Sequence, residues 1–304
     1  MEKTTSILVL LTTEAEEMAQ ASMQATGGGH HLTPTNIARM SAIAARESGI
    51  NLGPEKADFL VARLGRIVEK MSNGNFSEYC SVIENRNNTT EIRQFLEAIT
   101  THTTSFFREN GQYEWLDEAG FDILWSNRTG SKRELVVWSA ACSTGQELYT
   151  AMLQARSSAK GSLASLRVKG IGTDLSRSVV ASAGRAIYDT TEISGIPLHL
   201  RREYLLTSKS NPNIHRISQD IRSMTEWRVG NLTQSNTLTG IEADIVFLRN
   251  VLIYFDDETQ ATVLKNVLSR VRPGGFLLTG HSETARVRTM GLTVVRPTIY
   301  RKES

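Results

Sequence analysis

The chain has 304 residues, and its 34 basic and 32 acidic residues leave a formal net charge of only +2 at pH 7. At roughly 100 to 200 residues per domain, this length allows one full hydrophobic core and a smaller second unit. The balanced charge gives no reason to expect nucleic acid as a partner. The two cysteines, Cys80 and Cys142, lack a CxxC spacing and argue against a disulfide framework or a zinc site.

Residues 1–30 carry little hydrophobic pattern and end in GGGHH, so we expect a variable extension or a short docking helix. Adjacent histidines in a glycine tract, His30 and His31, are more often solvated than metal-bound, and no metal is predicted. The apolar run Ser6–Leu11 is too short to cross a bilayer, and the residues before it do not form a basic leader. A cytoplasmic protein without membrane insertion is therefore expected.

Residues 31–100 are predicted to form a helical domain. Pro54 is placed at the first turn of a helix that continues to Met71 with one apolar face, and a Ser-Asn-Gly sequence then ends it. Four basic side chains share one arc of this helix, about 80° wide at 100° per residue: Lys56, Arg63, Arg66 and Lys70. This basic face is either a solvated flank or a docking surface for an acidic partner.

The stretch Thr100–Asn110 places threonine hydroxyls, two phenylalanines and one fixed positive charge in a single turn or helix start. Phe106 and Phe107 can be core residues and Arg108 a surface cation. Alternatively, the stretch belongs to a binding site.

The stretch Leu135–Thr150 is predicted to form a strand, a tight turn of small residues and the start of a helix. Small side chains let a ligand approach the backbone, and the free N–H groups of a helix start suit a polar or anionic ligand group. The alternative is an ordinary βα turn, because only Gly145 of a GxGxxG fingerprint is present.

The next strand, Val168–Thr173, ends in Asp174, where a doubly wound sheet can hold the two ribose hydroxyls of a nucleoside. We therefore expect a nucleoside cofactor across the strand ends. A helix is predicted over Ser176–Tyr188. From about residue 198 to 228 the pattern predicts short antiparallel strands around a polar loop, Ser208–Asn213, as a small β insertion.

The nearly continuous apolar run Ala243–Arg249 predicts a central parallel strand that delivers Asn250, Val251 and Tyr254 to the carboxyl edge of the sheet. Asp256 is expected to cap the following helix.

That helix is predicted to present Leu264, Val267, Leu268 and Val271 on one face and to end at Pro273–Gly275. A strand over Phe276–Thr279 and a last hairpin over Thr293–Tyr300 complete the chain. His281 and Ser282 do not predict a hydrolase, because adjacent strand residues point to opposite faces.

Six motifs in fixed order resemble the CheR family of chemotaxis receptor methyltransferases. They are THTTSFFR (Thr101–Arg108), WSAACSTGQELYT (Trp138–Thr150), GTDLS (Gly172–Ser176), GNL (Gly230–Leu232), FLRNVLIYF (Phe247–Phe255) and GHSE (Gly280–Glu283). The resemblance implies an α/β fold, a class I S-adenosylmethionine-dependent methyltransferase sheet of Rossmann-like, doubly wound type. A helical N-terminal domain would occupy residues 31–100, and the methyltransferase domain, with the β insertion about 198–228, residues 101–304.

The resemblance also implies transfer of the methyl group of S-adenosylmethionine to glutamate side chains of chemoreceptors, with S-adenosylhomocysteine as the product. The positions that match cofactor-binding positions of the family are His102, Thr104, Arg108, Glu147, Asp174, Asn231, Leu232, Asn250 and Val251. Arg108 and Tyr254 are hypothesised to balance charge near the acceptor and to orient it, as the catalytic pair.

This sequence departs from the family where His102 replaces asparagine, Gln146 replaces glutamate and Leu148 replaces proline. Imidazole can also donate a hydrogen bond. The loop Ser208–Asn213 lacks the glycine-containing turn of members that tether to a receptor's C-terminal peptide, so independence from such a tether is predicted. A monomer is expected, with receptors docking on the basic face.

Other functions stay open at this stage. The same fold could methylate another protein or a small molecule, or bind S-adenosylmethionine without turnover as a sensor. A nicotinamide dehydrogenase is disfavoured, because the glycines that admit a pyrophosphate are missing from Ala140–Gly145.

Overall fold

The computed structural model describes residues 32–127 and 134–303, and the chain divides after Thr100 into two compact units. The predictions for residues 1–30, including His30 and His31, lie outside the described residues. In the part that is described, no helix has the length and apolar character needed to span a bilayer.

The first unit is helical, as predicted. Its elements are α2 (Pro34–Ser48), the 3₁₀ turn η1 (Pro54–Lys56), α3 (Ala57–Ser72), α4 (Phe76–Glu84) and α5 (Thr89–Ile99). Side chains of Thr33 and Asn75 accept backbone N–H groups at the starts of α2 and α4, and Gly49 and Asn73 end α2 and α3 in the left-handed conformation. The helices enclose a core of their own that includes Met40, Leu60, Leu64, Tyr79 and Phe95.

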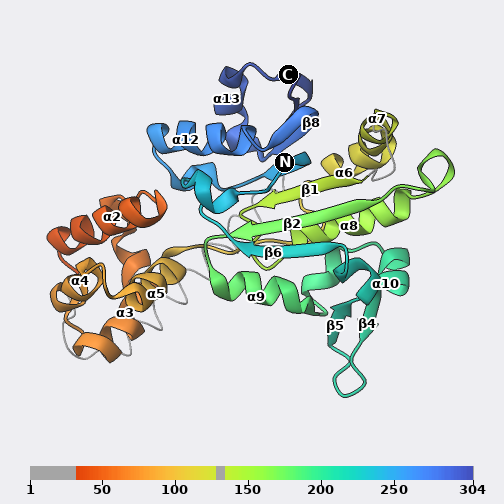
Figure 1. The fold of residues 1–304 in the computed structure, drawn as a ribbon. Coiled ribbons are helices and arrows are strands. Elements are labelled where there is room, and N and C mark those ends of the chain that lie inside the picture. Colours follow the sequence, from red (N-terminus) through yellow and green to blue (C-terminus); the bar gives the residue numbers. More distant parts are fainter. Residues whose placement is uncertain (1–31, 128–133, 304) are drawn as a thin grey trace, which may run out of the picture. The chain divides into compact units, whose positions relative to one another are not determined.

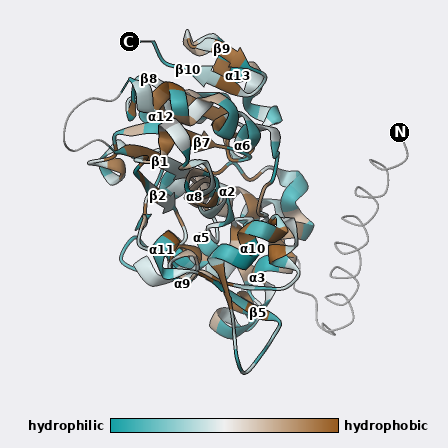
Figure 2. Ribbon diagram, turned by 90° about the vertical axis from the view of Figure 1, so that its right-hand side faces the viewer, coloured by the Kyte–Doolittle hydropathy of each residue, from teal (hydrophilic) through white to brown (hydrophobic). Residues whose placement is uncertain are grey.

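The helix predicted from Pro54 begins with a 3₁₀ turn, so Lys56 precedes the α-helical part of α3. All four residues of the basic face are exposed. Hydrophobic and hydrophilic residues alternate along α3 and α12, as in helices with one buried face (Figure 2).

The second unit is built on a seven-stranded sheet with the order β6-β2-β1-β7-β8-β10-β9 (Figure 1). The strands are β1 (Leu135–Ala140), β2 (Val168–Asp174), β6 (Thr225–Val229), β7 (Ala243–Leu248), β8 (Val271–Thr279), β9 (Thr293–Arg296) and β10 (Ile299–Arg301). The first five in spatial order are parallel, and β10 pairs antiparallel with β8 and β9. This arrangement confirms the predicted fold class, and the strand order reverses between β1 and β7.

Helices cover both faces of the sheet. They are α6 (Gly111–Trp115), α7 (Phe121–Ser126), α8 (Gln146–Ser158), α9 (Arg177–Arg185), α12 (Asp257–Leu268) and α13 (Thr284–Val287), with a π turn, η2 (Leu116–Gly120), between α6 and α7. Alternate strand residues enter different cores: Val137 and Phe247 pack with α8, whereas Trp138 and Leu248 pack with α12. Burial on both faces explains the nearly continuous apolar runs of the central strands.

A second, three-stranded antiparallel sheet has the order β3-β5-β4. Its strands are β3 (Ile187–Asp189), β4 (Leu205–Thr207) and β5 (Ile214–Ile217), and the short helices α10 (Leu198–Tyr204) and α11 (Gln219–Arg222) flank it. The predicted hairpin around the loop Ser208–Asn213 is confirmed, because β4 and β5 pair antiparallel.

The predicted limits of this insertion, 198–228, are wrong at both ends. The small sheet already begins at Ile187, because Ala186 adopts the left-handed conformation (φ 55°) and ends α9 at Arg185. The predicted helix Ser176–Tyr188 is therefore too long, and Tyr188 lies in β3. At the other end, Thr225–Val229 forms β6, which pairs in parallel with β2 and belongs to the main sheet.

The predicted end of the α12 helix is also wrong. The helix stops at Leu268, and Val271 and Pro273–Gly275 lie in β8. The ladder between β7 and β8 shifts its register between Ala243 and Ile245, opposite this Pro-Gly-Gly segment. A strand tolerates proline at such an irregularity because the missing N–H is not required there.

Candidate functional site

The residues predicted to bind the cofactor come from separate segments that converge on the carboxyl edge of the parallel strands. Asp174 is the last residue of β2, and Asn231 and Asn250 follow β6 and β7. Glu147 lies in the first turn of α8, just after β1. Because the order reverses between β1 and β7, this edge is the one at which doubly wound sheets bind ligands.

The turn between β1 and α8 is tightly held. Ala141, Ser143 and Gly145 have φ values of 67°, 49° and 98°, all in the left-handed region. The Tyr188 hydroxyl donates to the carbonyl of Thr144 at 2.8 Å. A Cβ at Gly145 would lie 2.9 Å from the Trp227 ring, so this position requires glycine both for its conformation and for its space. The predicted strand, turn and helix start are thus confirmed.

Asp174 joins the turns after β1 and β2. Its carboxylate accepts the backbone N–H of Ser143 at 2.9 Å and that of Ser176 at 3.0 Å. Burial raises the pKa of Asp174, although these N–H groups and the nearby His102 act against the increase. The Leu175 backbone also bonds to this carboxylate. Since a carboxylate has about four acceptor positions, capacity remains for a hydroxyl of a ribose.

His102 is half-buried, and its charge lowers the pKa of Asp174. Its carbonyl accepts the hydroxyl of Ser143 at 2.8 Å, which ties the segment before Phe106 to the turn after β1. Gln146, which stands where the family has glutamate, forms hydrogen bonds with nearby side chains. Its amide group accepts from Thr144 at 2.7 Å and donates to Glu192 at 3.3 Å.

Glu147 is held by one hydroxyl and one guanidinium. Ser139 donates to its carboxylate at 2.7 Å, and a nitrogen of Arg249 lies 3.4 Å from the other oxygen. Burial raises the pKa of Glu147, and Arg249 and the Ser139 hydroxyl offset part of that increase.

Arg249 was not among the residues predicted from the sequence. Its side chain is only 2% exposed, and it also donates to the Tyr113 hydroxyl at 3.2 Å and to the carbonyl of Arg108. The one available signal was a charged residue at the end of the apolar run Ala243–Arg249.

Arg108 lies in an unusual segment. Phe107 and Glu109, on either side of it, both have φ 56°. Phe106 packs edge-to-face on Tyr188 with ring centroids 4.9 Å apart, so it is a core residue, as one of the two interpretations held. The Arg108 guanidinium donates to the carbonyl of Thr103 at 3.3 Å, in the same segment as half-buried Thr104.

The segments after β6 and β7 supply the remaining predicted residues. The Asn231 side chain accepts from the backbone and the hydroxyl of Thr233, at 3.0 and 2.8 Å, and so forms a closed turn. The next residue, Leu232, is buried in the core beneath α12. Asn250 has φ 56° and lies against Gly280, where a Cβ would come within 3.2 Å of its side-chain nitrogen.

Buried Glu283, in the turn η7 (His281–Glu283) after β8, accepts the N–H of Val251 at 3.1 Å and the Ser282 hydroxyl at 2.9 Å. This carboxylate therefore links the ends of β7 and β8. Tyr254 is the last residue of the turn η6 (Leu252–Tyr254) and is half-buried.

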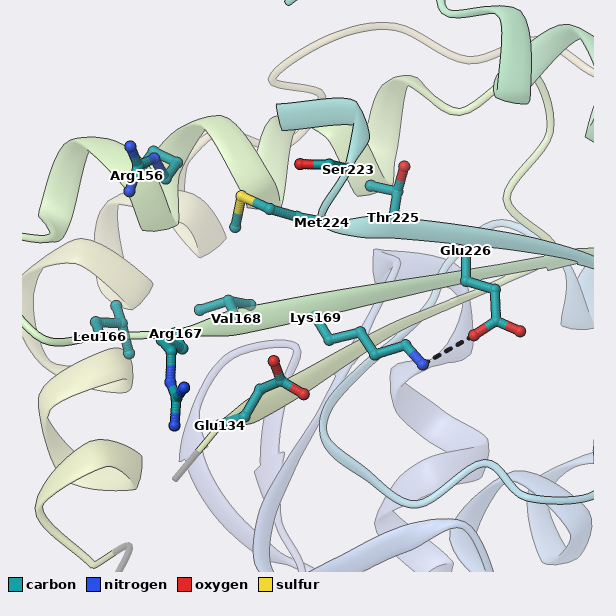
Figure 3. Close-up of a pocket in the computed structure, with 10 residues that line it drawn as sticks. All are labelled: Glu134, Arg156, Leu166, Arg167, Val168, Lys169, Ser223, Met224, Thr225 and Glu226. Atoms are coloured by element: carbon teal, nitrogen blue, oxygen red, sulfur yellow. Dashed lines mark ion pairs between the residues drawn. The ribbon is translucent and has the colours of Figure 1, made fainter. Parts of the chain in front are cut away.

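A cavity of about 470 Å³ lies at the opposite, amino edge of the sheet (Figure 3). Figure 3 shows Arg156 entering from α8 and Lys169 paired with Glu226, at 2.9 Å. None of the predicted site residues lines this cavity. Within residues 32–127 and 134–303, no group of three or more His, Cys, Asp or Glu side chains is placed to hold a metal ion.

Comparison with known proteins matches nearly the whole described chain. The all-alpha domain of CheR methyltransferases matches residues 35–100, and their SAM binding domain matches residues 102–300. The chemotaxis protein methyltransferase of Borreliella burgdorferi is 28% identical over 273 residues, which are 90% of this chain and 95% of that protein. Chemotaxis protein methyltransferase 2 of Pseudomonas aeruginosa is 30% identical over 273 residues, covering 88% of this chain and 94% of that protein.

Proposed function

The chain belongs to the CheR methyltransferase family, and we propose that residues 31–100 dock the substrate while residues 101–304 carry out methyl transfer. The protein transfers the methyl group of S-adenosylmethionine to glutamate side chains of methyl-accepting chemoreceptors and so forms glutamate methyl esters. It acts as a monomer in the cytoplasm.

The donor set at the carboxyl edge fits S-adenosylmethionine. Asp174 would accept the ribose hydroxyls, and Glu147 offers a second carboxylate near the turn of small residues. Thr104, Asn231, Leu232, Asn250 and Val251 are the further contacts that we propose, together with His102, whose charge acts on Asp174. The observation that carries the proposal is the buried carboxylate of Asp174 and the half-buried carboxylate of Glu147 beside a turn of three left-handed residues.

The reaction needs no general base. The acceptor glutamate, with an ordinary pKa of about 4.3, is already ionised at neutral pH and is therefore nucleophilic. When bound, S-adenosylmethionine supplies a methyl carbon activated by its sulfonium group. The chain's own residues have to hold the acceptor oxygen in line with that carbon and to keep water away.

We assign two roles to residues near the acceptor. Arg108 balances charge near the incoming carboxylate, and Tyr254 orients the acceptor. Replacing Arg108 by Ala should strongly reduce methyl transfer while the fold persists, and wild-type turnover in that variant would refute its role.

The direct test is a labelled-methyl assay on membranes that contain chemoreceptors. Base-labile label on receptor protein is the expected product, because a methyl ester hydrolyses in base. Asp174→Asn should suppress the label. Label that resists base, or that appears only on small molecules, would contradict the proposed acceptor.

The same assay tests the tether. The loop Ser208–Asn213 between β4 and β5 has no glycine, and we propose that this protein does not need a receptor's C-terminal peptide. Receptors with and without their C-terminal tails should be labelled at the same rate. A rate that collapses on removal of the tail would show that the tether is used.

A further inference from the structure

A buried guanidinium lies between two parts of the proposed site. The Arg249 side chain donates to the carbonyl of Arg108 and, at 3.2 Å, to the Tyr113 hydroxyl. Its nitrogens also lie 3.4 Å from the Glu147 carboxylate and 3.6 Å from the Glu109 carboxylate. A planar guanidinium with five donors can hold several acceptors in one fixed geometry, which an ammonium group cannot.

One of these groups belongs to a strained backbone. Non-glycine residues seldom adopt φ near 56°, yet Phe107 and Glu109 both do so, directly before and after Arg108. Such conformations persist only where the surroundings hold them. Here the holding contacts are the Phe107 N–H to the Thr150 hydroxyl at 3.2 Å and the donation from Arg249 to the Arg108 carbonyl.

The charges around Arg249 are incompletely bonded. Its nitrogens lie 3.4 Å from Glu147 and 3.6 Å from Glu109, longer than the roughly 2.7 to 2.9 Å of a charge-assisted hydrogen bond. Among the described residues, the Nε of Arg249 and the Oε2 of Glu109 are buried without a hydrogen-bond partner. Networks of this kind are often loose in the free enzyme and tighten on ligand binding.

We propose that Arg249 is a positioning residue for methyl transfer. It holds the backbone of Arg108 at a fixed place relative to the carboxylate of Glu147, and it acts on the reaction through Arg108. The inference rests on the proposed function, which places Arg108 beside the acceptor and Glu147 beside the cofactor.

The test compares four proteins in one assay: wild type, Arg249→Lys, Arg108→Ala and the double variant. Lysine keeps the charge but loses the planar guanidinium that holds several acceptors at once. We expect kcat to fall by about 10- to 100-fold, since small misplacements of a catalytic group reduce rates to this extent. The affinity for S-adenosylhomocysteine, measured by calorimetry, should change less than kcat. In the Arg108→Ala background, the same lysine substitution should lower kcat by less than about threefold, because residues that act as a unit are not additive.

Arg272→Lys is the matched control. Arg272 pairs with the buried carboxylate of Asp244 at 2.9 Å, at the amino edge of the same sheet. The Arg272→Lys variant should lose about as much stability as Arg249→Lys but should keep the wild-type kcat. If Arg249→Lys fails to fold, Tyr113→Phe takes its place, because it removes one hydroxyl from the same network. It is then compared alone and in combination with Arg108→Ala.

Three outcomes would overturn the inference. A wild-type kcat in the variant of the Arg249 network would refute the positioning role of Arg249. The role would also be refuted if this variant lowered kcat as much in the Arg108→Ala background as in the wild type. An equal loss of kcat in Arg272→Lys would show a purely structural effect. Wild-type transfer by Arg108→Ala would refute the assigned role of Arg108 itself, so the failure of the proposed function is distinguishable from failure of this inference.

Discussion

The buried carboxylate of Asp174 and the half-buried carboxylate of Glu147 lie beside the turn after β1, at the carboxyl edge of the sheet. Burial raises the pKa of both Asp174 and Glu147, although each has partners that favour its charged form. The charged forms are the ones that can accept hydrogen bonds on both oxygens from a ribose or an amino group. A cofactor that binds there must therefore select the deprotonated protein.

We predict a pH dependence of cofactor affinity from these shifts. Both free-state pKa values lie above the ordinary values of 3.8 and 4.5, and a proton on either group must leave before the cofactor binds. Affinity for S-adenosylhomocysteine should thus be full above the raised values and decline as the pH falls through them. Calorimetric titrations at a series of pH values measure this decline.

Glu147→Gln and Asp174→Asn should each bind more weakly and lose part of the pH dependence. Asp244→Asn, a buried carboxylate at the far edge of the sheet, should keep the wild-type profile. An affinity in the wild type that is flat down to the ordinary pKa values would contradict the prediction.

Gly145 gives a prediction about stability. Alanine there must adopt φ 98° and place its Cβ 2.9 Å from Trp227 and 3.0 Å from Ala183, so we expect a loss of about 1 to 3 kcal/mol. Gly240→Ala is the control, because Gly240 has a similar φ of 73° with no atom within 4 Å, and should cost only about 1 kcal/mol. Urea unfolding of both variants tests the difference, and equal losses would show that packing at Gly145 contributes nothing.

At the scale of elements, most helices and strands follow from sequence pattern. The errors lie where a pattern continues past a real boundary. Alanine and isoleucine after Arg185 prolong the helical pattern of α9, yet Ala186 turns the chain and Ile187 and Tyr188 pair with β5. Pro273–Gly275 is typical of a helix end, yet these residues lie in β8 because the ladder is irregular there.

The helix α3 offers a prediction at this scale. Gly65 lies inside it, and a Cβ added there would meet no atom within 4 Å, so alanine fits without displacing a neighbour. Gly65→Ala should stabilise the helical unit by roughly 0.5 to 1 kcal/mol, because glycine loses more backbone freedom on folding. Thermal or urea unfolding measures this gain, and a destabilised variant would contradict it.

At the scale of the molecule, we assign different tasks to the two units. The basic face on α3 is exposed, and a positive stripe suits an acidic helical segment of a receptor, so we propose that this face docks the receptor. Electrostatic docking of this kind raises association rates and weakens with salt. We place the site for methyl transfer in residues 101–304, which contain the match to the SAM binding domain.

We expect Arg63→Glu and Arg66→Glu together to weaken binding to receptor fragments and to abolish most of its salt dependence. Arg86→Glu is the matched control, because it makes the same charge change at an exposed position of the same unit outside α3. Labelled-methyl transfer and binding at several ionic strengths report the effect. Binding that is indifferent to salt and to both reversals would make the face a solvated flank.

The sequence by itself determined the fold class and most of the candidate site. Apolar runs buried on both faces mark parallel strands, and the residues that follow such strands must lie at one sheet edge, so Asp174, Asn231 and Asn250 could be found without coordinates. The ordered motifs added the family and its chemistry. Each of these signals depends on residues that are close in the sequence, so each can be recognised from one sequence alone.

Only the tertiary structure decided which distant side chains meet. Arg249 reaches Arg108 and Tyr113 across more than a hundred residues, and β6 joins the main sheet only by pairing with β2. A buried charge at the end of an apolar strand has no partner in its own sequence neighbourhood. Its partners, and therefore its role, depend on how the strands and loops pack in space.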